Sequence, residues 1–323
     1  MKTWQADLAI ILAATIWGMS FIFTSWGLND CSPALFLLCR FGLALLISLA
    51  LFWRHLRGLN RKTARQGIIL GIFMGGGYLL QNYSINFTEV SRAAFIAALT
   101  LPAIPLVSFI LFREKVKPNN LLGIILALAG LYLLLDPNFN GIRSGDVIAL
   151  LSVPLWALYL IYINIYTEGN EEPRLTSKLL VLQFVGAIPL VLLAAIVFES
   201  GLIPPIHPDL GKGLTLSKYF VAGLLFCAIL ASICIVFIQT ACQKYTSPIQ
   251  AMLCFQFEPI TATLGAWLFL DEFVPLKAVI GAGVIILGVL TSELGGMLLA
   301  KRQAEKTAPP ETPPAGPSDP PVG

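Results

Sequence analysis

Residues 121–135, LLGIILALAGLYLLL, form an apolar run without a single charged side chain. Large side chains follow one another without the alternation of a membrane β-strand, so the run predicts a helix. A helix satisfies its own backbone hydrogen bonds, which lipid cannot do. Nine other stretches have the same character. With boundaries good to a few residues, the ten predicted spans are 8–28, 34–53, 67–87, 93–112, 119–135, 146–166, 179–198, 219–238, 248–270 and 276–299.

The composition places these runs in a membrane. Only 12% of the residues are charged, 57% are hydrophobic and the mean hydropathy is +0.80. A soluble domain of this size could not cover so much apolar surface with polar groups. A hydrocarbon core about 30 Å thick needs about 20 helical residues, which matches the runs. The chain is therefore predicted to be an all-α membrane protein with ten transmembrane helices facing the lipid bilayer.

The distribution of Lys and Arg predicts the orientation. With a cytoplasmic N-terminus, fifteen of the 21 basic residues fall in inner connections and termini, and five fall in outer connections. The remaining one, Arg40, lies inside the second run. This asymmetry predicts cytoplasmic N- and C-termini, with residues 54–65 as the strongest anchor. The membrane is expected to be a bacterial inner (plasma) membrane. The basic residues thus serve topology, and we expect no nucleic-acid partner because no soluble domain is predicted to bind one.

The first half of the chain recurs in the second. Trp17 corresponds to Trp156 at a displacement of 139 residues. At displacements of 140 to 158 the further matches are Pro33 with Pro173, Pro102 with Pro259, Pro118 with Pro275, Glu114 with Glu272, Gly123 with Gly281 and Gly130 with Gly288. Each half holds five spans, and because five is odd the second copy enters the membrane from the opposite side. We predict two inverted five-helix repeats, 1–138 and 139–300, and a disordered, Pro-rich cytoplasmic tail at 301–323.

These residues also carry a resemblance to a known family. Trp17-Gly18 with Phe21, Arg40-Phe41, Pro102 with Glu114, and Glu258-Pro259 with Asp271-Glu272 resemble the EamA branch of the drug/metabolite transporter (DMT) superfamily. The resemblance covers about residues 7–298. It implies two inverted, EamA-like five-helix repeats around a central cavity, which move small metabolites by alternating access, often outward. Bacterial members that this chain resembles include amino-acid exporters.

Two charged residues lie inside the predicted spans. A central Arg costs roughly 2.5–3.5 kcal/mol in a membrane helix, so Arg40 needs a partner. That partner is either a substrate carboxylate or a structural group, namely a protein carboxylate or helix-end carbonyls. Glu258 lies beside Pro259, which opens the helix ladder. It either carries a coupling proton or contacts substrate, or it is a fixed structural partner.

One face of the third span is polar. Tyr78, Gln81, Asn82 and Asn86 follow helical spacing. Hydrogen bonds between helices would explain one or two of them, whereas the full set predicts the wall of a cavity between the third, fourth, eighth and ninth spans. The other candidate substrate-binding residues are Gln239 and Gln250 and the aromatic residues Trp17, Phe95, Trp156 and Tyr159. The alternative for each aromatic residue is a role in helix packing or as an interface anchor, which is the more common one in membrane helices. Pro102 and Pro259 are predicted to kink helices at gates.

Two further patterns predict helix packing. Gly67, Gly71 and Gly75 form a double GxxxG motif, which brings the backbone of a neighbouring helix close. Glu114, Asp271 and Glu272 lie at predicted helix ends, where they are expected to cap a helix or form a salt bridge.

The sequence contains no catalytic motif and no metal-ligand spacing, so we expect no enzyme activity, no metal and no cofactor. The predicted function is secondary transport of a small molecule, with amino acids or related metabolites first and with protons as the candidate coupling ion. The alternatives are a membrane scaffold or an intramembrane enzyme without transport, and a nucleotide, purine or sugar-type substrate. A nucleotide sugar would need several cationic groups around its phosphates, and the spans offer only Arg40.

Overall fold

The computed structural model describes residues 3–113, 118–135, 141–167, 170, 172, 174–201, 211–242, 255, 257–288, 290 and 291. These residues form helices and connections, without a strand among them. The helices are α1 (Thr3–Leu28), α2 (Pro33–Phe52), η1 (Trp53–Leu56), α3 (Arg61–Ile85), α4 (Val90–Ala98), α5 (Thr100–Phe112), α6 (Pro118–Leu135), α7 (Ser144–Thr167), α8 (Leu175–Ala194), η2 (Ala195–Glu199), α9 (Lys218–Leu225), η4 (Phe226–Cys234), α10 (Ile235–Cys242) and α12 (Phe257–Phe269). A last helix covers Leu276–Gly288.

Six described helical segments are long and apolar enough to cross a membrane. They are Leu8–Leu28, Pro33–Leu56, Arg61–Ile85, Ser144–Thr167, Leu175–Glu199 and Lys218–Ile238. They agree within a few residues with the first three and the sixth to eighth predicted runs. The fifth and tenth runs contain shorter apolar helices, Leu121–Leu133 and Leu276–Gly288, and the ninth contains α12. The chain is an all-helical, multi-pass membrane protein.

The fourth predicted run is broken rather than straight. Helices α4 and α5 meet at Leu99 with a bend of 42°. Pro102 has no N–H to donate to the carbonyl of Ala98, where α4 ends, and its ring clashes with that carbonyl in a straight helix. The predicted kink at Pro102 therefore lies at the junction of two helices.

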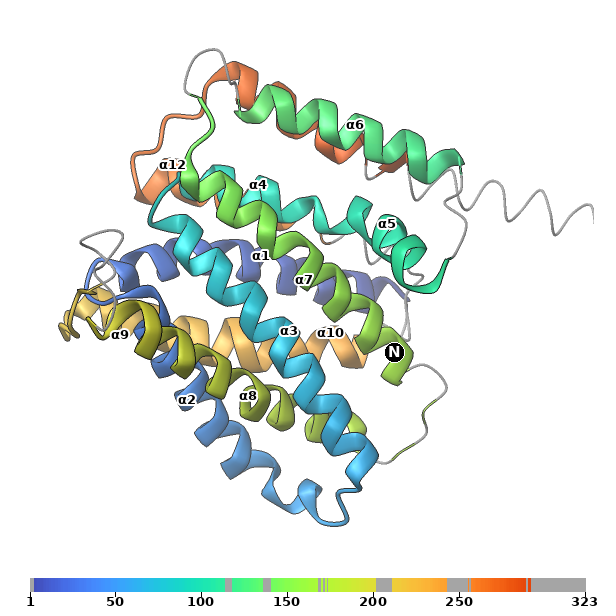
Figure 1. The fold of residues 1–323 in the computed structure, drawn as a ribbon, viewed down its shortest axis with the longest axis vertical. Coiled ribbons are helices and arrows are strands. Elements are labelled where there is room, and N and C mark those ends of the chain that lie inside the picture. The colour runs from blue at the N-terminus through green and yellow to red at the C-terminus, as the bar shows by residue number, and fades with distance from the viewer. Residues whose placement is uncertain are drawn as a thin grey trace, which may run out of the picture.

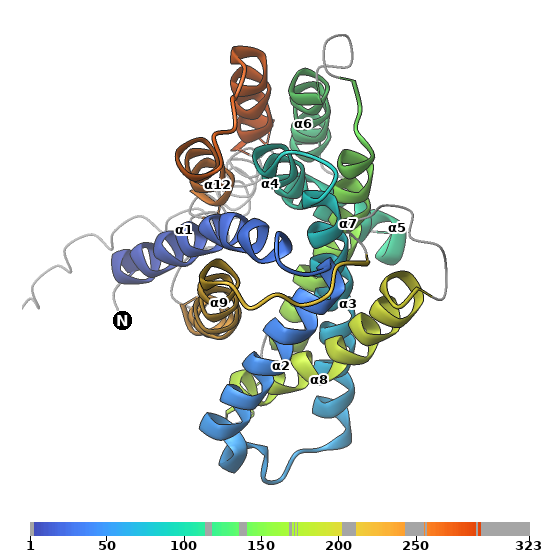
Figure 2. The ribbon, with the colours of Figure 1, turned by 90° about the vertical axis from the view of Figure 1, so that its left-hand side faces the viewer.

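The helices lie side by side (Figure 1). Helix α1 packs against α12 and against the continuous helix formed by α9, η4 and α10. In the second half, α7 packs against α4 and α5 and against α3. Helices α2 and α8 pack against each other, and Figure 2 shows α6 beside the last helix at the opposite end of the bundle. These two packing arrangements of α1 thus have counterparts around α7.

Glycines permit a close contact between α3 and α8. A Cβ atom on Gly71 would overlap the carbonyl of Gln183, and one on Gly186 would lie 2.5 Å from the carbonyl oxygen of Ile68. Gly75 meets Ala187 in the same way, with 2.9 Å to its Cβ. The predicted close-packing role of the double GxxxG motif is confirmed.

Helix α6 and the last helix contact each other reciprocally. A Cβ on Gly130 would lie 2.6 Å from the carbonyl oxygen of Gly281, and one on Gly288 would lie 2.6 Å from that of Gly123. The sequence repeat matches Gly123 with Gly281 and Gly130 with Gly288. Exchanging the members of each matched pair therefore turns one contact into the other.

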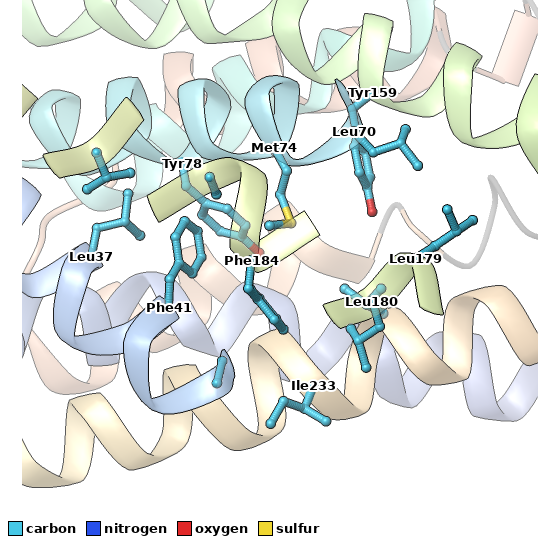
Figure 3. Packing of buried hydrophobic residues seen from close by; sticks show 14 of the residues in the cluster. Leu37, Phe41, Leu70, Met74, Tyr78, Tyr159, Leu179, Leu180, Phe184 and Ile233 are labelled. Atoms are coloured by element: carbon cyan, nitrogen blue, oxygen red, sulfur yellow. The ribbon is translucent and has the colours of Figure 1, made fainter. Parts of the chain in front are cut away.

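The largest apolar cluster lies where α2, α3, α7 and α8 meet. Figure 3 shows Phe41, Met74, Tyr78 and Phe184 in this cluster, and all four are buried. The outward surface is also apolar: Leu121, Leu122, Ile125 and Leu128 of α6 are each at least half exposed. A soluble protein would bury such a stripe, whereas lipid covers it in a membrane.

Two helices are capped at their first turns by carboxylates that lie far away in the sequence. Glu199 accepts hydrogen bonds from Ser32 Oγ, from the amides of Ala34 and Leu35 at the start of α2, and from Tyr83 Oη, at 2.6–3.2 Å. Glu272 accepts from the amides of Val90 and Ser91 at the start of α4, at 2.7 and 3.1 Å. These amides have no partner within their own helix. The predicted capping role of Glu272 is confirmed, and Glu114 lies outside the described residues.

Arg92 is one of the five basic residues that the charge analysis assigns to outer connections, but the structure places it in α4. It is 4% exposed and lies in the first turn of α4, where it forms a salt bridge with Asp146 of α7. Asp146 also accepts from Thr88 Oγ1 at 2.6 Å and from the amide of Arg143 at 2.9 Å. The pair is thus buried and fully hydrogen-bonded, a state that sequence spacing does not reveal.

Candidate functional site

Arg40 of α2 is buried without a carboxylate. Its side chain is 1% exposed, and no salt bridge to it is formed among the described residues. Its Nε donates to Ser232 Oγ of η4 at 2.9 Å, and its Cζ lies 4.3 Å from the centroid of the Tyr78 ring. Its Nη2 is buried and has no hydrogen-bond partner. The protein thus holds the cation by one hydrogen bond and one aromatic face, and leaves a donor unused.

Tyr78 of α3 joins the aromatic residues of three helices. Its hydroxyl accepts from Trp17 Nε1 of α1 at 2.9 Å. Its ring meets Phe41 of α2 and Trp156 of α7 edge-on, with centroids 5.6 and 4.8 Å apart. The two tryptophans also contact each other, with centroids 5.7 Å apart and planes at 79°. The residues that the repeat matches across the two halves therefore meet beside Arg40.

Polar atoms without partners continue along α3 and onto α7. Asn82 Nδ2, Asn86 Nδ2 and Trp156 Nε1 are buried and form no hydrogen bond. The oxygen and nitrogen of an amide are interchangeable in such assignments, whereas the indole nitrogen and a guanidinium nitrogen are donors in any assignment. Trp156 and Arg40 therefore both carry unused donors, and both contact the Tyr78 ring. Gln81 and Asn82 are themselves buried, so the predicted polar face of the third span points into the protein.

Glu258 lies in the first turn of α12, where α12 crosses α1. A Cβ on Gly18 would overlap the backbone carbonyl of Glu258, so this crossing depends on a glycine. The Glu258 carboxylate is close enough to Tyr78 to interact with it electrostatically. It forms no salt bridge with Arg40 within the described part of the chain. Arg40 and Glu258 thus approach Tyr78 as separate charges.

The structure brings some of the predicted residues together and leaves others apart. Trp17, Arg40, Tyr78 and Trp156 form one group, and Asn82 lies one helical turn beyond Tyr78. Phe95 packs in a different apolar cluster, with Ile96 and Leu99. Pro102 in α5 and Pro259 in α12 are buried. Gln250 and the side chain of Gln239 lie outside the described residues.

Sequence reasoning missed Ser232. A serine in an apolar helix carries no signal that distinguishes it from the other serines of the spans. Its neighbour Arg40 is 192 residues away in the chain, and only the fold brings them together. Among the described residues no three His, Cys, Asp or Glu gather as a metal site.

The fold and this buried polar group define a class, the multi-pass membrane proteins that carry polar groups inside an apolar helical bundle. A family comparison narrows the class. The model of the EamA-like transporter family matches residues 4–136 and again residues 143–293. The chain belongs to the EamA-like transporter family, and it is a membrane transporter by family.

Relatives of the chain are named as transporters, without a substrate in the name. An uncharacterized transporter of Archaeoglobus fulgidus is 24% identical over 294 residues, covering 91% of this chain and 87% of the relative. An uncharacterized transporter of Bacillus subtilis is 22% identical over 292 residues, covering 87% and 94%. A crystal structure is similar to 94% of this chain and 99% of its own, with a TM-score of 0.60 and 18% identity, which supports the fold alone.

Proposed function

We propose that the protein is a secondary carrier that exports a small zwitterionic metabolite, with amino acids first, across a bacterial inner membrane by alternating access. The observation that carries the proposal is the buried Arg40, whose Nη2 has no protein partner. Burying a cation without a carboxylate partner costs free energy. A substrate carboxylate would accept charge-assisted hydrogen bonds from the donor that the protein leaves unused. The surrounding aromatic rings suit the apolar body of an amino acid.

The proposal includes ten helices in two inverted five-helix repeats. Three observations support it. The family model matches the chain in two consecutive segments of similar length. The matched residues Trp17 and Trp156 lie in contact. The glycine contacts between α6 and the last helix are reciprocal. A pseudo-two-fold axis in the membrane plane accounts for all three, and exchange between two related states is how such repeats give alternating access.

Arg40→Ala tests the substrate class. Purified protein in proteoliposomes is assayed with a panel of radiolabelled amino acids, their carboxamides, purines and sugars. Transport of the carboxylate substrate is expected to fall by about 10- to 100-fold in kcat/KM, the value of about 1.5–3 kcal/mol for hydrogen bonds to a charged group. The carboxamide should lose much less. Arg40→Lys keeps the charge without the planar fork and is expected to restore only part of the transport.

Equal losses for both substrates, in a protein that still folds and inserts, would make Arg40 structural. Wild-type transport of a purine or sugar but of no amino acid would contradict the zwitterion assignment. A wild-type protein that inserts into the membrane but transports none of the probes would favour a membrane scaffold.

Glu258 is the proposed carrier of a coupling proton. Flux is measured with and without an imposed pH gradient, in the wild type and in Glu258→Gln. We expect the gradient to accelerate the wild type and to leave Glu258→Gln unchanged, because the amide cannot exchange a proton. A wild-type flux that ignores the gradient, or a variant that still follows it, removes the proton role.

A further inference from the structure

The helix that contacts Arg40 departs from α geometry at the contact. Phe226–Cys234, nine residues between α9 and α10, are π-helical, and the amide of Ile235 bonds to the carbonyl of Leu230 five residues earlier. Such geometry is rare and occurs mostly as single turns, frequently at functional sites. The segment turns Ser232 toward α2.

The hydroxyl of Ser232 has a fixed direction. It donates to the carbonyl oxygen of Cys227, five residues earlier, at 2.8 Å. A guanidinium can only donate, so the Arg40 Nε–H must point at a lone pair of this oxygen, at 2.9 Å. With Ser232 only 2% exposed, water does not compete for the hydroxyl. The π-helical carbonyl of Cys227 thus makes Ser232 an obligate acceptor.

This contact decides which edge of the Arg40 guanidinium stays available. Ser232 occupies Nε, and the Tyr78 ring covers one face at 4.3 Å. The side edge of a guanidinium, formed by Nε and Nη2, is therefore interrupted. The end edge, formed by Nη1 and Nη2, remains, and Nη2 has no protein partner. A carboxylate accepts two parallel N–H bonds from such an edge.

The geometry points to Ser232 as a positioning residue that, held by η4, orients Arg40 so that a substrate carboxylate binds its Nη1–Nη2 edge end-on. This inference rests on the proposed function and adds to it the binding geometry and the residue that sets it.

The test compares Ser232→Ala with Ser232→Thr in proteoliposomes. The probes are the radiolabelled amino acid that the wild type transports fastest and the carboxamide of that amino acid. Ser232→Ala is expected to raise KM for the amino acid by about 5- to 30-fold, less than the loss expected for Arg40→Ala, because Ser232 acts on the substrate only through the orientation of Arg40. kcat and the carboxamide KM should change less than twofold, and Ser232→Thr should restore the wild-type KM because it keeps the hydroxyl.

Ser48→Ala is the matched control. Ser48 lies on α2 with Arg40 and is buried, and among the described residues its hydroxyl donates only to the Leu45 carbonyl of its own helix, at 3.1 Å. It should behave as the wild type. If Ser232→Ala does not fold, Ser232→Cys, with a weaker acceptor, should show an intermediate KM shift.

The outcomes separate this inference from the proposed function. If Arg40→Ala discriminates amino acid from carboxamide but the Ser232 variants leave KM unchanged, or raise it equally for both probes, the positioning role is overturned and the carboxylate site stands. If Arg40→Ala fails to discriminate, or no amino acid is transported, both fall.

Discussion

Two arginines are buried within the described part of the chain, and they are held in opposite ways. Arg92 meets the Asp146 carboxylate, which Thr88 and a backbone amide also contact. Arg40 meets a hydroxyl and an aromatic ring. A closed ion pair stabilises the fold, whereas a cation that retains a free donor is what the proposed carboxylate site requires. The sequence alone marks both as costly and cannot distinguish them.

Removing Arg92 from its ion pair with Asp146 should therefore lower the stability of the fold more than removing Arg40. Arg92→Ala leaves Asp146 buried and charged, which costs about 3–5 kcal/mol. We expect the apparent melting temperature of Arg92→Ala in detergent to lie well below that of Arg40→Ala. Size-exclusion chromatography after heating measures the fraction of each protein that remains folded. An Arg40→Ala protein that melts as low as Arg92→Ala would assign Arg40 a structural role.

At the scale of helices, contacts between backbones set the packing distance. The α3–α8 and α6–last-helix crossings each depend on glycine, because any Cβ would meet a carbonyl of the opposite helix. In lipid this close approach supplies the attraction that the hydrophobic effect supplies in water. A larger side chain at these glycines would therefore force the two helices apart.

Gly130→Ala and Gly288→Ala should destabilise the protein to a similar extent, by about 1–3 kcal/mol each, since both place a methyl group against backbone. Gly283→Ala is the control on the last helix, because a Cβ there meets nothing within 4 Å. Thermal melting in detergent measures all three. A Gly283 variant as unstable as the other two would show that helix propensity or detergent contact, rather than the crossing, sets the stability.

The contact of Glu172 with Lys178 and Thr63 should make the stability of the fold depend on pH. Glu172, in the connection before α8, accepts from Lys178 Nζ at 2.6 Å and from Thr63 Oγ1 of α3 at 2.7 Å. The Lys178 hydrogen bond is the main reason that the pKa of Glu172 is lowered from its usual value. A lowered pKa stabilises the folded protein above the usual carboxyl range and ceases to do so as the pH falls through the folded-state pKa.

The melting temperature of the wild type should therefore exceed that of Glu172→Gln at neutral pH, and the gap should close as the pH is lowered below about 4. Glu89→Gln serves as the control, because Glu89 pairs with Arg143 at a site about one third exposed. Its gap at neutral pH should be smaller. A Glu172 gap that widens on acidification contradicts the assignment.

At the scale of the whole molecule, orientation in the membrane is a prediction that labelling decides. Arg57 lies after η1, and Gly213 lies before α9; both are exposed. Arg57→Cys should react with a membrane-impermeant thiol reagent from the cytoplasmic side, and Gly213→Cys from the other side. Burial raises the pKa of the Cys31 thiol to about 12, so this native cysteine should remain unlabelled. Labelling of both variants from one side would overturn the topology.

How far the sequence predicts this molecule depends on the range of the interaction. Runs such as 121–135 reveal helices, because lipid requires every span to satisfy its own backbone. The glycines of α3 reveal a close crossing, though not that its partner is α8. The break at Leu99 was suggested by Pro102, but its place between α4 and α5 was not.

The candidate site shows the same limit. Arg40, Tyr78 and Trp17 are found from the sequence because polar and aromatic groups stand out in apolar spans. Ser232 is not, since its role depends on a π-helical segment and on a contact across 192 residues. Phe95 stays a prediction: the structure places it in an apolar cluster with Ile96 and Leu99, apart from the group around Arg40.

The carboxylates that cap α2 and α4 are synthesised long after the helices that they cap. The amide of Ala34 bonds to Glu199, 165 residues later, and that of Val90 bonds to Glu272, 182 residues later. A ribosome that adds about 5–20 residues per second delivers these acids about 8–36 s after the helices they cap. During synthesis the early helices therefore wait in the membrane with open ends, and the amino-terminal half becomes complete only as the carboxyl-terminal half arrives.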